Sequence, residues 1–208
     1  MVARVAGQVG RSVSLGKVGR MAAAGGTGPI GPYPASVGDD AEAQVDYDKL
    51  RRRVLWTFPS GLFALGSRAG DRRNLMTINW VTQVSFEPKL IGVGIEKPAV
   101  THGLVADGGV FTLNTIARED RAIVRKFTKP CEWDAGESTL NGFKVHDGAA
   151  TGAPILDQAP AFLECEVRQA VELGEHTFFI GEIVNAGFQA DETTEVLRME
   201  DTRMNYGG

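Results

Sequence analysis

Short β-strand patterns separated by turns dominate the distribution of hydrophobic and polar residues after residue 60. Near the C-terminal end, Leu163, Cys165 and Val167 alternate with charged residues, which predicts a strand with one buried face. Gly174 and Glu175 then form a turn into a partner strand. Many short strands joined by tight turns favour an antiparallel barrel, so we predict a mainly β protein with a few peripheral helices. The predicted strands are residues 62–67, 74–88, 89–95, 109–114, 163–171 and 176–186.

The stretch from Asn74 to Pro88 stands out because small hydrogen-bonding side chains are scattered among its apolar residues. Asn74, Thr77 and Asn79 are polar but uncharged, and in a half-buried strand a ligand can satisfy such groups. The strand is expected to pair with residues 62–67 and to end at Pro88, which has no backbone N–H for a sheet. We predict one edge of a binding cleft here, although an ordinary barrel strand with exposed polar positions fits the same pattern.

Two of the three predicted helices have no assigned ligand. The first covers residues 47–56, with Asp46 as its N-cap. Its three arginines suit phosphate, but a solvated helix face is the favoured interpretation. The other covers residues 116–129 and is amphipathic, with acidic residues first and basic residues last, as the helix dipole favours. Residues 130–160 are predicted to be loops, and His146 is interpreted as a loop residue.

A short helix with Thr101 as its N-cap is predicted to end at residues 107–109. The free N–H groups at its start, with Lys97, Thr101 and His102 beside them, would suit a phosphate group. A capped helix without any ligand fits these residues equally well.

The N-terminal residues differ from the rest of the chain. Residues 1–45 are rich in glycine and alanine, and they carry four basic residues but no acidic residue before Asp39. Such a segment buries too little apolar surface to offset the entropy of ordering, so we predict a disordered arm. It loosely resembles a transit peptide, and Met21 could equally be the start. One domain is expected to cover residues 46–208.

Charge and cysteine content exclude several classes of partner. All 26 acidic residues lie after residue 38 with 18 of the 22 basic residues, a balance of −8 that argues against nucleic acid. Cys131 and Cys165 lack Cys-x-x-Cys spacing, so we expect no disulfide framework and no metal site, and a cytoplasmic location. No apolar run approaches the ~20 residues of a membrane helix, so no membrane partner is expected.

Five segments, in their order along the chain, carry a family resemblance. They are residues 74–90, 97–102, 111–114, 174–182 and 204–208. Together they resemble the flavin reductase-like, FMN-binding split-barrel family, over about residues 50–208. The resemblance implies a homodimer of Greek-key split β-barrels, with one FMN in each of two clefts near the subunit interface.

The same resemblance implies roles for individual residues. Lys97, Thr101 and His102 fall where the family holds the flavin phosphate. His176, in a Gly-Glu-His segment that resembles the family's Gly-Asp-His, falls where nicotinamide is expected to dock, although a lone histidine opening a strand is more often a surface residue. The residues expected around the flavin ring and ribityl chain are Asn74, Leu75, Met76, Thr77, Asn79, Trp80, Ser85, Phe86 and Asn114.

The implied activity is transfer of hydride from NADH or NADPH to flavin, with FMN expected as the flavin and FAD also compatible. Reduced flavin or electrons would then pass to an acceptor such as a partner monooxygenase. No Gly-x-Gly-x-x-Gly follows a strand, because Gly92 and Gly94 lack the third glycine, so a Rossmann-type dinucleotide site is not expected. Two other classes stay open: a flavoredoxin-like electron carrier without its own dinucleotide site, and a split-barrel oxidase or heme-handling protein.

Overall fold

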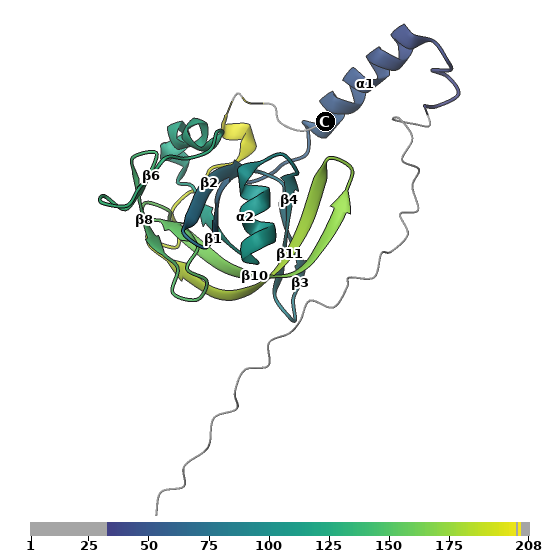
Figure 1. Ribbon diagram of the computed structural model, residues 1–208. Helices are drawn as coiled ribbons and strands as arrows, with labels where there is room; N and C mark the ends of the chain where they lie inside the picture. The colour runs from purple at the N-terminus through teal and green to yellow at the C-terminus, as the bar shows by residue number, and fades with distance from the viewer. Residues whose placement is uncertain (1–32, 203, 205–208) are drawn as a thin grey trace, which may run out of the picture.

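The computed structural model describes residues 33–202 and residue 204 (Figure 1). The helical elements are α1 (Ala41–Leu55), α2 (Val100–Gly108), η1 (Arg118–Phe127) and η2 (Met199–Asp201). The strands are β1 (Phe63–Ala69), β2 (Arg72–Ile78), β3 (Val81–Ser85), β4 (Leu90–Glu96), β5 (Val110–Thr115), β6 (Trp133–Asp134), β7 (Thr139–Leu140), β8 (Phe143–Asp147), β9 (Pro154–Leu156), β10 (Ala161–Leu173) and β11 (His176–Phe188). The mainly β prediction is confirmed.

Seven strands form one antiparallel sheet in the order β2-β1-β5-β10-β11-β4-β3. Its two outermost strands, β2 and β3, are joined by only two residues, Asn79 and Trp80. The sheet must therefore curl until its edges meet at this link, which we call the seam. Within the described strands no ladder pairs β2 with β3, so the barrel is split there.

The seam corrects one prediction. Residues 74–88 were expected to form a single strand, but the chain breaks at Asn79 and Trp80. The first half pairs with β1 as predicted, in a register that opposes Leu65 and Met76. The second half instead pairs with β4 at the other edge of the sheet, where Val81 opposes Val93.

Alternating side chains of the large sheet fill the barrel. From β4, the side chains of Ile91, Val93 and Ile95 are buried against Phe111 of β5 and Phe179 of β11. Helix α2 contributes to the same core and contacts β1 and β2 as well as β4. It therefore packs against strands from both halves of the sheet and covers one side of the barrel (Figure 1).

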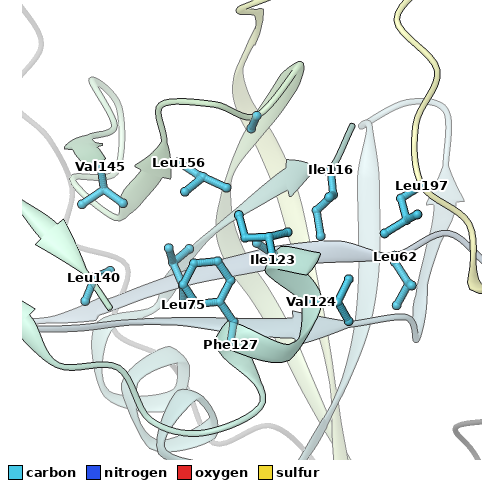
Figure 2. Close-up of a cluster of buried hydrophobic side chains, with 12 residues drawn as sticks. Leu62, Leu75, Ile116, Ile123, Val124, Phe127, Leu140, Val145, Leu156 and Leu197 are labelled. Atoms are coloured by element: carbon cyan, nitrogen blue, oxygen red, sulfur yellow. The ribbon is translucent and has the colours of Figure 1, made fainter. Parts of the chain in front are cut away.

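A second hydrophobic cluster lies under η1 and a small sheet (Figure 2). The amphipathic helix expected at residues 116–129 is a 3₁₀ helix interrupted at Asp120, but it buries the expected apolar face through Ile123, Val124 and Phe127. Residues 130–160, expected to be loops, contain the four-stranded sheet β6-β7-β8-β9. His146 lies on β8 and contacts Asp157 Oδ1 through Nδ1 at 2.7 Å.

Helix α1 begins earlier than predicted and projects from the barrel (Figure 1). Its N-cap is Asp40 rather than Asp46, and Asp40 Oδ1 accepts hydrogen bonds from the N–H groups of Glu42 and Ala43 at 2.9 and 3.3 Å. The domain boundary expected at residue 45 therefore falls inside a helix. Residues 1–32 of the predicted arm lie outside the described residues.

The start of α2 also differs from the prediction. Ala99, not Thr101, is the N-cap, and no side chain caps the helix. The C-terminal end is as predicted, because Gly109 adopts a left-handed conformation with a φ of 67°. Among the described residues, no helix has the length and apolar character needed to cross a membrane.

Candidate functional site

Two adjoining cavities open at the seam, and they share a wall made by Asn79, Met199 and Met204. Cavity 1 has a volume of about 560 Å³ and is also lined by Leu55, Trp56, Phe58, Pro59, Ser60, Trp80, Val81, Thr82, Gly94, Leu173, His176 and Phe178. Cavity 2 has a volume of about 340 Å³ and is also lined by Leu62, Asn74, Met76, Thr77, Ile78, Glu96, Pro98, Ala99, Val100, Thr101, Phe127, Thr128, Lys129 and Pro130.

Asn74 fixes the walls of cavity 2. Its buried side chain donates from Nδ2 to Thr101 Oγ1 at 2.8 Å, and its Oδ1 accepts from the backbone N–H of Cys131 at 2.8 Å. These two bonds tie β2 to the first turn of α2 and to the segment after η1. Leaving this buried amide unpaired would be costly, so both bonds are strongly favoured. Asn74 thereby fixes the relative positions of three elements that line cavity 2.

One part of cavity 2 combines a helix start with a positive charge. Residues 98–101 lie on its wall at the start of α2; the N–H of Ala99 already bonds the carbonyl of Glu96 and that of His102 bonds the carbonyl of Ala99, which leaves the N–H groups of Val100 and Thr101 as the donors of this turn. Lys129 adds a positive charge to the same cavity, and Glu96 is the carboxylate among its lining residues. Neutral polar side chains and apolar ones cover the remaining wall.

The structure does not bring the three predicted phosphate ligands together. Thr101 lines cavity 2, but Lys97 lines neither cavity, and its Nζ lies 3.9 Å from Glu172 Oε2. His102 Nε2 is 2.8 Å from Thr177 Oγ1, and its ring packs against Phe179. Burial lowers the pKa of His102, and the nearby charge of Lys97 lowers it further, against an opposite effect of Glu172. His102 lines neither cavity, and its Nε2 atom is already engaged by the Thr177 hydroxyl.

Cavity 1 is aromatic and carries no Asp, Glu, Lys or Arg among its described lining residues. Strand β11 supplies two of its side chains by alternation, because His176 and Phe178 face the cavity while Thr177 and Phe179 are buried in the barrel. The rings of His176 and Trp80 are 4.5 Å apart between centroids and are tilted by 42°. Ser60, Asn79 and Thr82 provide neutral hydrogen-bonding groups.

Four of the predicted flavin residues lie outside both cavities. Leu75 is buried in the hydrophobic cluster under η1. Ser85 and Phe86 lie at the tip of the β3–β4 hairpin, where Phe86 is 83% exposed. Asn114 is fully buried, and its amide bonds the carbonyl of Ala64 and the N–H of Leu156 at 2.9 Å each. The amide of Asn114 therefore ties β1 and β9 to β5, and its expected place near a bound ring stays a prediction.

The remaining predicted residues do converge on the seam. Asn74, Met76 and Thr77 come from β2, Asn79 and Trp80 from the link, and His176 from β11. Thr77 also donates from Oγ1 to the carbonyl of Val124 at 2.7 Å, which ties η1 to β2.

Several lining residues escaped the sequence analysis. Lys129 and Thr128 follow η1, the segment 56–60 follows α1, and Met199 begins η2. These segments are far apart along the chain and meet only through tertiary folding. The one available signal was the cluster of Trp56, Phe58 and Pro59, an apolar segment that follows a charged helix.

The described residues contain no group of three or more His, Cys, Asp or Glu side chains that could hold a metal ion.

Neither cysteine suits thiolate chemistry. Burial raises the pKa of Cys165 to about 12, with a further contribution from Glu164. Burial also raises the pKa of Cys131, whose Sγ donates to the carbonyl of Leu75 at 3.2 Å.

Comparison with known proteins identifies the kind of domain in which these cavities lie. The family described as flavin reductase like domain matches residues 55–208. A protein named NADH-dependent FAD reductase, from Streptomyces globisporus, is 30% identical over 141 residues, which are 65% of this chain and 73% of that protein. Other matched proteins are longer: the chain covers 23% of a putative diflavin flavoprotein of Synechocystis and 58% of a high molecular weight rubredoxin of Moorella thermoacetica.

Two solved structures are similar to this one in overall fold. The NADH:FAD oxidoreductase of Streptomyces globisporus C-1027 is 28% identical, with a TM-score of 0.62 over 74% of this chain and 88% of that chain. The flavoredoxin of Methanosarcina acetivorans is 28% identical, with a TM-score of 0.55 over 65% of this chain and 71% of that chain.

Proposed function

Because the chain belongs to the flavin reductase-like domain family, we propose that it is an NAD(P)H:flavin oxidoreductase. One observation carries the proposal. Two cavities of different character adjoin at Asn79: cavity 2 has Lys129, Glu96 and the start of α2 in its wall, and cavity 1 is aromatic, with no charged side chain among its described lining residues. Such a pair suits a phosphorylated flavin beside the nicotinamide of a dinucleotide.

The residues of cavity 2 fit FMN as the flavin. The isoalloxazine ring needs apolar faces and polar edges, which Met76, Ile78, Thr77 and Asn79 offer, and the phosphate needs donors and positive charge. The start of α2 with Lys129 supplies these in place of the Lys97 and His102 first expected. Bound flavin would supply the hydride-accepting chemistry. The protein's part is to hold the flavin, exclude water and orient the donor.

Cavity 1 is proposed to take the nicotinamide end of NADH or NADPH. His176 lies in the wall of cavity 1 next to Trp80. Hydride transfer from nicotinamide to flavin involves no proton on this histidine. Its proposed role is to position the donor ring. The Streptomyces oxidoreductase has been solved with NAD and FAD fragments, and it is similar to this chain at 28% identity. This supports a flavin and a nicotinamide nucleotide as ligands.

A second candidate function is electron transfer without a dinucleotide site. The similarity to flavoredoxin favours it, since that structure covers 65% of this chain at 28% identity. A carrier would hold flavin in cavity 2 and accept electrons from another protein, so free NADH and NADPH would leave its flavin oxidised.

The test is anaerobic reduction of the flavin-loaded protein. We expect NADH or NADPH to bleach the flavin absorbance of the wild type. His176→Ala should slow bleaching by up to about 100-fold, because a reacting ring displaced by about 1 Å loses roughly that factor. Its affinity for FMN should stay close to that of the wild type, as fluorescence titration would show.

His146→Ala is the matched control, because His146 lies on β8 outside both cavities and pairs with Asp157. Bleaching at the wild-type rate in His176→Ala would remove His176 from the site. A wild type that neither nucleotide bleaches would favour the carrier.

A further inference from the structure

One loop supplies a wall of cavity 2 and carries its positive charge. Residues 127–131 lead from the end of η1 toward β6, and the first four of them line the cavity. Among the described lining residues of cavity 2, Lys129 is the cation. The direction in which Lys129 presents its charge therefore depends on how the backbone of residues 127–131, which we call the lysine loop, is held.

The side-chain amide of Asn141 closes the lysine loop at both ends. Its Nδ2 donates to the carbonyl of Lys126 at 2.8 Å, and its Oδ1 accepts from the N–H of Glu132 at 2.9 Å. The backbone N–H of Asn141 also donates to the carbonyl of Glu132 at 3.0 Å. One residue, distant from the cavity along the chain, therefore brackets the whole loop.

Strand β2 holds the second end of the lysine loop from another side. The N–H of Cys131 donates to Asn74 Oδ1 at 2.8 Å, and Cys131 Sγ donates to the carbonyl of Leu75 at 3.2 Å. Asn141 joins this end to the first one, so the two ends keep a set separation. Lys129 lies between them.

The turn that contains Asn141 does not itself require a side-chain amide. Leu140 of β7 pairs with Phe143 of β8 across the two residues Asn141 and Gly142, whose φ angles are 51° and 81°. Positive φ at both positions is the requirement of a type I′ hairpin turn, and Asn, Asp and Gly all meet it at the first position. The two side-chain bonds to the lysine loop therefore account for the amide, and the turn does not.

Resting on the flavin reductase function above, we propose that Asn141 is a positioning residue for recognition of the flavin phosphate, because it holds the lysine loop so that Lys129 faces that phosphate. Asn141 lines neither cavity. Its effect on binding therefore passes through the loop, and it is confined to a flavin that carries a phosphate.

The test is the variant Asn141→Gly in the full-length protein, because glycine keeps the turn and removes both amide bonds. Fluorescence titration should show FMN affinity falling about three- to tenfold, where tenfold is the loss expected when a charge-assisted contact disappears. Affinity for riboflavin, which has no phosphate, should change by less than about twofold.

The double variant Asn141→Gly with Lys129→Ala tests the route of the effect. If Asn141 acts through Lys129, the double variant should bind FMN no more weakly than Lys129→Ala alone. Losses that multiply in the double variant would show that Asn141 acts through other groups, and they would overturn the proposal.

Gln189→Ala is the matched control for the loss of a structural amide. Gln189 Nε2 donates to the carbonyls of Leu156 and Ala159 at 2.9 and 2.8 Å, and Gln189 lies outside both cavities. This variant also loses two hydrogen bonds, so urea denaturation should show it to be less stable. Its affinities for FMN and riboflavin should both stay within about twofold of the wild type.

A second variant covers the case in which Asn141→Gly does not fold. Asn141→Asp keeps the turn and the bond from Glu132 but cannot donate to Lys126. It should likewise weaken FMN and spare riboflavin, measured in about 0.5 M salt, which screens the added charge.

Equal losses of FMN and riboflavin in the Asn141 variants would reveal a purely structural residue and overturn the proposal, as would unchanged FMN affinity. A wild type that binds FMN no more tightly than riboflavin would overturn it too, because Lys129 would then contact no phosphate. The flavin reductase function fails separately, if neither NADH nor NADPH reduces the flavin-loaded wild type. A loss specific to FMN in Asn141→Gly would support the positioning role even then.

Discussion

Glu164 shows what one buried charge contributes to this fold. Its carboxylate accepts hydrogen bonds from the N–H groups of Ala150 and Thr151, from the Thr151 hydroxyl and from the Asn185 amide, with lengths of 2.7 to 3.3 Å. Burial raises the pKa of Glu164, but these hydrogen bonds together outweigh it, so the pKa lies below its ordinary value of 4.5. The residue ties the loop before β9 to β10 and β11.

Glu164→Gln should lower the free energy of unfolding by about 2–3 kcal/mol at pH 7, because the charge-assisted bonds are lost and the amide NH2 group replaces one of the two oxygens that accept from these donors. A group whose folded pKa is depressed stabilises the protein above its unfolded pKa. That stability is lost as the pH falls through the folded pKa. The difference between wild type and variant in urea melts should therefore shrink below about pH 4.5.

The double variant Glu164→Gln with Asn185→Asp exchanges the two roles, so that the amide at position 164 donates to a carboxylate at position 185. It should recover part of the lost stability at pH 7. A gap between wild type and Glu164→Gln that stays constant from pH 7 to pH 3 would show that the charge of Glu164 contributes nothing.

A second prediction at the scale of single residues concerns the effect of Lys129 and Lys97 on flavin binding. Lys129 lines cavity 2, whereas Lys97 lies near Glu172 and lines neither cavity. Lys129→Ala should weaken FMN binding by about 1.5 kcal/mol, roughly tenfold, and leave riboflavin binding nearly unchanged because riboflavin has no phosphate. Lys97→Ala, the matched control, should leave both affinities close to wild type. Equal losses of FMN and riboflavin in Lys129→Ala would assign Lys129 to the surface.

At the scale of elements, the sequence pattern predicted the hairpins, whose strands pair with neighbours close in sequence. The hairpins β1–β2 and β10–β11 follow from alternation and turn residues near in sequence, and both were found where expected. The break at Asn79 and Trp80 has no signal of its own, because polar and apolar residues mix on both sides of it. Only pairing with the distant β4 decides that β3 separates from β2.

Other elements were missed for related reasons. Strands β6, β7 and β9 have only two or three residues, too few for any period to show. Helix η1 keeps the apolar spacing of an α-helix, so its 3₁₀ geometry was hidden, although its buried residues were not. The site residues on β2, the seam and β11 were predicted from one local stretch and a family resemblance. Lys129, Met199 and residues 56–60 reach the seam only through the whole fold.

At the scale of the whole molecule, α1 has no buried residue in the single chain. Val45, Leu50, Val54 and Leu55 are each about half exposed on this 15-residue helix, which is a marginal length for an isolated helix in water. The hairpin tip at Phe86 is a further exposed apolar surface. We therefore retain the homodimer as a proposal, with α1 packed against the second copy.

Light scattering should then give twice the 22.3 kDa mass of one chain at micromolar concentration. Leu50→Glu with Val54→Glu should shift the protein toward the monomer, because charges in an apolar interface are costly. Arg53→Glu is the control for charge alone on the same helix. The mass of a single chain for the wild type across micromolar concentrations would contradict the dimer.

The seam has a consequence for how the cleft opens. Elsewhere around the large sheet, widening the barrel would break the ladder hydrogen bonds between neighbouring strands, but no ladder joins β2 and β3. The perimeter of the barrel can therefore expand at one place by bending Asn79 and Trp80 and by parting side chains. Opening at this place would require less free energy than global unfolding, because it breaks no ladder. A ligand bound at the seam would contact both edge strands and hold them together. The backbone amides of β2 and β3 should therefore exchange more slowly with solvent when the ligand is bound.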